Sequence, residues 1–133
     1  MNHSCTAARK RLNFRERYSF DRAFGRHDAR VNRQNAGDIG DNAEARANIK
    51  LYRVAEPTVS ASGPASTVAL SGVETFTFTY PDGPHNAESL MVDPKTSDAF
   101  IVVKASSGKS PVFRASAPFA SGVLQQVATL TFG

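Results

Sequence analysis

Short apolar runs alternate with clusters of turn-forming residues through the stretch Val73–Ala115. The first run, VETFTFTY, alternates strictly, so that Phe76, Phe78 and Tyr80 share one face and threonines the other. A period of two residues is typical of a β-strand with one buried face. Turn clusters at a spacing of about ten residues join such strands into an antiparallel meander. The stretch therefore predicts an all-β fold.

The same criteria place strands along the rest of the chain. We predict them at Ile49–Val54, Val73–Tyr80, Ala87–Val92, Ala99–Lys104, Pro111–Arg114 and Val123–Phe132, with a weak strand at Thr67–Leu70. The run AFIVVK is almost entirely apolar, which predicts a central strand that is covered on both faces. Pro111 has no N–H group, which favours an edge position for its strand. Gln125 and Gln126 interrupt the last run, where we expect a bulge.

Positive charge is concentrated at the N-terminus. Residues 1–35 hold nine Lys and Arg and three Asp and Glu, whereas residues 36–133 hold seven and nine, within a net charge of +4. Interleaved aromatic residues make a nucleic-acid-binding arm one interpretation of this segment. Its few apolar residues favour instead a disordered leader, at most weakly helical over residues 14–24. We therefore expect a flexible leader at 1–35, a β fragment at 36–133, and no nucleic-acid partner.

Several protein classes are excluded by composition. Cys5 is the lone cysteine of the 133 residues, so neither an intrachain disulfide nor a cysteine zinc cluster is possible. No apolar run approaches the roughly 20 residues that span a bilayer. The N-terminal segment lacks the apolar core of a signal peptide, so no export signal is expected in this sequence.

Acidic and amide side chains cluster in the loop AGDIGDN, residues 36–42. Asp38, Asp41 and Asn42 lie within five residues of one another, and their oxygen atoms are of the kind that Ca²⁺ prefers. The spacing differs from that of an EF-hand loop. The alternative is a self-capped turn, in which these side chains bond to neighbouring N–H groups. A short helical turn at Ala43–Ala47, capped by Asn42, is expected to follow.

A second polar cluster follows the turn after the aromatic strand. It contains Asp82, His85 and Glu88. Glu88 could serve as a general acid–base or a cation ligand, and His85 as a base or ligand. The alternative is structural: Asp82 caps the turn, His85 lies at the surface, and Glu88 bonds to backbone N–H groups. The residues leave both interpretations open.

Several of these motifs recur in order in a known family. The segments are AGDIGDN, IKLYRVAEP, FTYPDGPHNAESLMVDPKTSDAFIVVK and PVFRA. Together they resemble a family of bacterial, secreted, mostly uncharacterised β-propeller proteins. They are more distantly similar to phytase-like esterase propellers. The family pattern has Asp where this chain has Asn86, and Gly where it has Ser97. Residues 1–35 match no part of the family.

The resemblance implies a fold and two candidate functions. It implies a fragment of about one to two propeller-type blades, since whole propellers have four to eight, and a secreted or periplasmic location for a full-length protein. The first candidate is a binding or structural module, with a calcium site formed by Asp38, Asp41, Asn42 and Glu88. The alternative is a phytase-like or esterase-type hydrolase that uses a metal held by the acidic cluster. A fragment would also expose open strand edges, through which self-association is expected.

Overall fold

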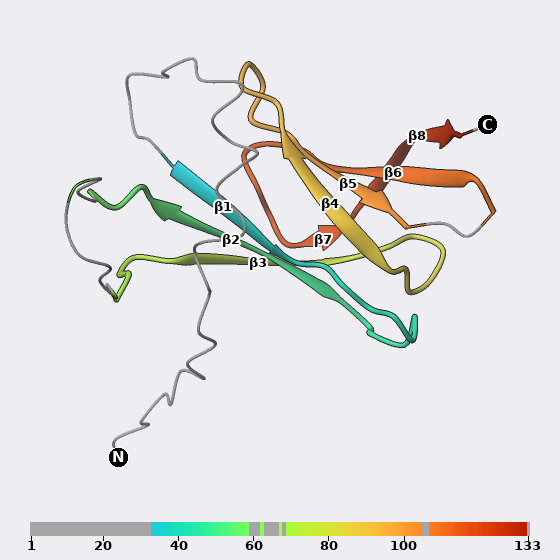
Figure 1. The fold of residues 1–133 in the computed structure, drawn as a ribbon, viewed down its shortest axis with the longest axis horizontal. Helices are drawn as coiled ribbons and strands as arrows, with labels where there is room; N and C mark the ends of the chain where they lie inside the picture. Colours follow the sequence, from blue (N-terminus) through green and yellow to red (C-terminus); the bar gives the residue numbers. More distant parts are fainter. Residues whose placement is uncertain (1–32, 59–61, 63–66, 68, 105–106, 133) are drawn as a thin grey trace.

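The computed structural model describes residues 33–58, 62, 67, 69–104 and 107–132 (Figure 1). The regular structure in these residues consists of strands, so the all-β prediction is confirmed. The strands are β1 (Arg33–Asp38), β2 (Ile49–Ala55), β3 (Glu74–Thr79), β4 (Ala87–Val92), β5 (Ala99–Val103), β6 (Lys109–Ala115), β7 (Gly122–Val123) and β8 (Gln125–Thr131).

The strands form two four-stranded sheets, which Figure 1 shows as two groups crossing each other. The first sheet has the order β1-β2-β3-β7, and the second has the order β4-β5-β6-β8. Neighbours are antiparallel except β3 and β7, which pair in parallel over two residues. The meander predicted over Val73–Ala115 is present as β4-β5-β6, but β3 belongs to the other sheet, where β1-β2-β3 form a second meander.

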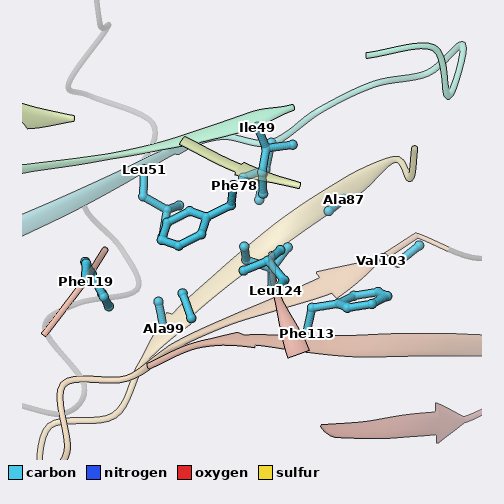
Figure 2. Close-up of a cluster of buried hydrophobic side chains, with 12 residues drawn as sticks. Ile49, Leu51, Phe78, Ala87, Ala99, Val103, Phe113, Phe119 and Leu124 are labelled. Atoms are coloured by element: carbon cyan, nitrogen blue, oxygen red, sulfur yellow. The ribbon is translucent and has the colours of Figure 1, made fainter. Parts of the chain in front are cut away.

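One hydrophobic core lies between the two sheets (Figure 2). The first sheet contributes Ile49, Leu51 and Phe78, and the second contributes Ile101 and Phe113 among others. The connection from β6 back to the first sheet adds Phe119 to this core, and Leu124, the residue between β7 and β8 in the chain, is also a member. Because both sheets bury the same core, neither can separate without exposing apolar surface to water.

The buried aromatic face and the central position of β5 are confirmed. Phe78 on β3 is buried, and Phe76 on β3 and Tyr80 directly after it pack against the core, as the alternation predicts. β5 is a central strand between β4 and β6, with Ala99 and Ile101 fully buried. The predicted cover on both faces is not observed, because Phe100 and Val102 are only partly buried and lie outside the core cluster.

The first strand was not predicted. Residues Ala36–Asp38, assigned above to the acidic loop, belong to β1, which begins at Arg33 within the predicted leader. The sequence RQNAGD has no alternation, so the strand is held by pairing with β2 rather than by its own pattern. The weak strand at Thr67–Leu70 is also wrong: Thr67, Ala69 and Leu70 are not in a strand, and Val68 lies outside the described residues.

Two predictions about the last strands need correction. β6, which contains Pro111, is not an edge strand, because it lies between β5 and β8. Its pairing with β5 ends at Val112, so the missing N–H of Pro111 lies beyond that ladder. The last run is split at Leu124 into β7 and β8, and the register of β8 shifts opposite Val112 and Phe113. The interruption at Gln125 and Gln126 thus marks both a break and a bulge.

The helical turn predicted at Ala43–Ala47 is absent. A tight turn stands there instead, closed by a hydrogen bond of 3.0 Å from the Glu44 N–H to the Asp41 carbonyl. The helix predicted at residues 14–24 lies outside the described residues. Across the described part of the chain, no helix has the length and apolar character needed to cross a membrane.

Candidate functional site

Arg46 lies at the centre of the acidic loop. Its Nη1 donates hydrogen bonds to Asp38 Oδ1 and to the Gly40 carbonyl, both at 2.9 Å. Its backbone N–H donates to Asp41 Oδ2 at 2.6 Å. The hydrogen bond to Asp38 raises the pKa of Arg46 further above its usual value, which means that the charged guanidinium is favoured. The loop therefore contains its own cation.

Asn86 ties this loop to the start of β4. Its Oδ1 accepts a hydrogen bond from the Asp41 N–H at 2.9 Å, and its Nδ2 donates to Asn42 Oδ1 at 3.0 Å. Next to it, the Ala87 N–H donates to the Ile39 carbonyl at 3.4 Å. One amide side chain thus serves as acceptor and donor between two segments that belong to different sheets.

Glu88 is paired elsewhere. Its Oε1 accepts a hydrogen bond from Lys104 Nζ at 2.9 Å, and both side chains are exposed. In the described part of the chain, no group of three or more His, Cys, Asp or Glu side chains is placed to hold a metal ion. The structure therefore places Asp38 at the end of β1, Asp41 and Asn42 in the loop that follows it, and Glu88 in an ion pair with Lys104.

Asp82 and His85 contact each other across the turn between β3 and β4. His85 Nε2 lies 2.8 Å from Asp82 Oδ1. The imidazole also packs edge-on against the Tyr80 ring, at 4.9 Å between centroids, and against Phe113 at 5.3 Å. Gly83, between them in the sequence, has a φ of 112°, a backbone conformation that residues with a side chain rarely adopt. His85 is thus partly buried on the aromatic core, not simply at the surface.

Sequence analysis missed Arg46 and the role of Tyr80. The available signal for Arg46 was its place as the first basic residue after the acidic loop, four positions beyond Asn42. Tyr80 was identified as a core aromatic, but its hydroxyl is buried and has no hydrogen-bond partner among the described residues. Buried polar atoms are nearly always satisfied, so this hydroxyl marks an unusual environment beside Asp82 and His85.

We expect the Tyr80 hydroxyl to ionise only in strong alkali. Burial raises its pKa from about 10 to about 12. The folded state therefore holds this proton more tightly than the unfolded chain, and the stability gained is complete below pH ~10 and is lost as the pH rises towards 12. In a pH titration, the phenolate absorbance of the wild type minus that of the Tyr80→Phe variant reports on Tyr80 alone. This difference should rise near pH 12. A difference curve centred near pH ~10 would contradict the burial of this group.

Comparisons with known proteins return no match: no protein-family model, no curated protein and no solved structure shows significant similarity to this chain. The function is therefore argued below from the geometry of the described residues.

Proposed function

We propose that this chain is a β-propeller-type module with a binding or structural role, in which the two sheets correspond to neighbouring blades. The proposal is supported by two successive four-stranded sheets that share one core. It is also supported by the close approach of β1 and β4, the first strand of each sheet. A Cβ added at Gly37 on β1 would lie 3.3 Å from Leu90 Cδ2 on β4.

One observation favours a structural role for the acidic residues over hydrolysis. Each candidate carboxylate is bonded within the chain: Asp38 and Asp41 to Arg46, Asp82 to His85, and Glu88 to Lys104. A metal-dependent hydrolase needs carboxylates that converge on a cation and leave a position open for substrate. We infer that Arg46 supplies in the acidic loop the positive charge that calcium was expected to supply.

Replacing Arg46 with methionine is expected to tighten Ca²⁺ binding by about tenfold, which is ~1.4 kcal/mol. The substitution keeps most of the side-chain volume but leaves the carboxylates of Asp38 and Asp41 without their internal cation. Isothermal titration with Ca²⁺ measures the change. Amide chemical shifts, followed in parallel, should move at Asp38, Asp41 and Asn42.

The matched control is Arg53→Met, because Arg53 bonds to Glu74 on the first sheet and not to the acidic loop. Its Ca²⁺ affinity should equal that of the wild type. If wild type and Arg46→Met bind Ca²⁺ equally tightly at this loop, Arg46 is not the internal cation, and a calcium site formed by Asp38, Asp41 and Asn42 becomes the better account.

An assay of ester hydrolysis distinguishes the proposed binding or structural module from the alternative hydrolase. We expect no hydrolysis of p-nitrophenyl phosphate or p-nitrophenyl acetate above the buffer rate, with or without Ca²⁺. Turnover that requires Ca²⁺ and disappears on Asp38→Asn would overturn the proposed function and support the phytase-like alternative. The same variant should have unchanged circular dichroism, so that loss of fold is not mistaken for loss of activity.

A further inference from the structure

The second sheet has an apolar face directed away from the core. On β5, Ile101 and Val103 point into the core, so the alternate residues Phe100 and Val102 point outward. Residues paired directly across antiparallel strands share a face. The pairs Met91–Phe100, Val102–Val112, Val112–Ala128 and Ser110–Leu130 extend this face over all four strands. We call it the outer face; its apolar members are Met91, Phe100, Val102, Val112, Ala128 and Leu130.

Exposure confirms that this face is separate from the core. Val112 is only 6% exposed, yet it is not a member of the core cluster, so it is shielded by its neighbours on the outer face. Met91 and Leu130, on the two edge strands of the sheet, are each 41% exposed. The face therefore has a closely packed centre with large apolar side chains exposed on both sides.

The charged groups on the outer face and at its end have partners within the chain. Arg114, which aligns with Phe100, donates a hydrogen bond of 2.7 Å to Gln125 Oε1 and lies 3.9 Å from Asp98 Oδ2. At the other end, Lys104 pairs with Glu88. No charged residue occurs from Gln125 to Phe132, the segment that contains β8. A partner could cover the centre of this face without burying an unpaired charge.

The corresponding face of the first sheet is polar. On β2, Ile49 and Leu51 point into the core, so Lys50 and Tyr52 point outward. Their direct partners are Asp38 and Ala36 on β1, and Thr77 and Thr75 on β3. The two outward faces of this molecule therefore differ: one carries Lys, Asp and Thr, and the other is apolar.

We propose that the outer face of the second sheet binds the same face of a second copy of this chain, around a two-fold axis. Stacking in a head-to-tail manner would place the apolar face on Lys50 and Asp38, whose charges would lose water. Stacking like on like buries apolar against apolar surface and closes after two copies. Two sheets packed by their faces at a spacing of about 10 Å are a common arrangement in proteins. This inference does not depend on the proposed function.

The test is the molar mass of the full chain, measured by light scattering and by sedimentation velocity over a range of concentrations. The wild type should have twice the chain mass of 14.3 kDa. Met91→Lys and Leu130→Lys should each raise the dissociation constant by about tenfold or more, because the new charge would be buried without a partner. The matched control is Val73→Lys, since Val73 is 45% exposed and lies outside the second sheet.

The Met91→Lys variant also distinguishes dimerisation through the outer face from dimerisation through the open edge of β8. Met91 lies on β4, at the opposite edge of the sheet, so edge pairing through β8 would survive Met91→Lys. A wild-type chain that is monomeric at every concentration would overturn the proposal, and so would a Met91→Lys variant that dimerises as tightly as the wild type. Unchanged circular dichroism shows that each variant is folded.

Discussion

Replacing Phe113 with alanine is expected to lower the free energy of unfolding by about 3–5 kcal/mol. Phe113 is fully buried, and its ring contacts Tyr80 at 4.8 Å and His85 at 5.3 Å between centroids. These contacts join β6 of the second sheet to the segment that follows β3 of the first. The substitution removes the ring from the region where the sheets meet, and the rigid strands around it can close the cavity only in part. Urea denaturation, followed by circular dichroism, measures the loss.

The control is Val73→Ala, at a residue that is 45% exposed and outside the core. Its effect should stay within about 0.5 kcal/mol. Small domains are stable by only about 5–15 kcal/mol, so Phe113→Ala should leave a marginally folded protein. A loss of less than about 1 kcal/mol would mean that Phe113 does not hold the sheets together.

The strands that could be predicted are those in which the pattern of apolar side chains matches the burial of the strand. Phe76, Phe78 and Tyr80 alternate because β3 has one buried face, and Ala99, Ile101 and Val103 of the central strand β5 are apolar because they lie in the core. β1, with the sequence RQNAGD, has no such apolar pattern. Its Gly37 occupies a tight site, since a Cβ there would lie 3.0 Å from Ile39 Cγ2 and 3.3 Å from Leu90 Cδ2. That constraint comes in part from β4, about fifty residues away, and composition does not reveal it.

The same distinction holds for the candidate site. The proximity of Asp38, Asp41 and Asn42 follows from their closeness in the sequence, at the end of β1 and in the loop after it, and was predicted. Their bonding partners were not predicted, because the side chain of Asn86 reaches the loop from a residue 45 positions along the chain from Asp41. Ser97 is comparable: it adopts φ of 63°, a left-handed conformation that residues other than glycine rarely adopt.

Replacing Asn86 with alanine is expected to lower the free energy of unfolding by about 1–3 kcal/mol. The substitution removes the acceptor of the Asp41 N–H and the donor to Asn42 Oδ1, and Asp41 is only 8% exposed. A buried N–H that loses its acceptor and finds no water carries the full cost of desolvation. Urea denaturation gives the overall loss, and hydrogen exchange should show faster exchange at the Asp41 amide.

Two further variants show whether the amide of Asn86 matters in both of its roles. Asn86→Asp keeps an acceptor for the Asp41 N–H but places a carboxylate against Asn42 Oδ1, so its stability should fall as well. Asn48→Ala is the matched control, because the Asn48 side chain makes no hydrogen bond within the described part of the chain, and its effect should stay within about 0.5 kcal/mol. If Asn86→Asp were as stable as the wild type, the donor to Asn42 would contribute nothing. The link between the acidic loop and β4 would then depend on the Asp41 N–H and the Ile39–Ala87 backbone bond alone.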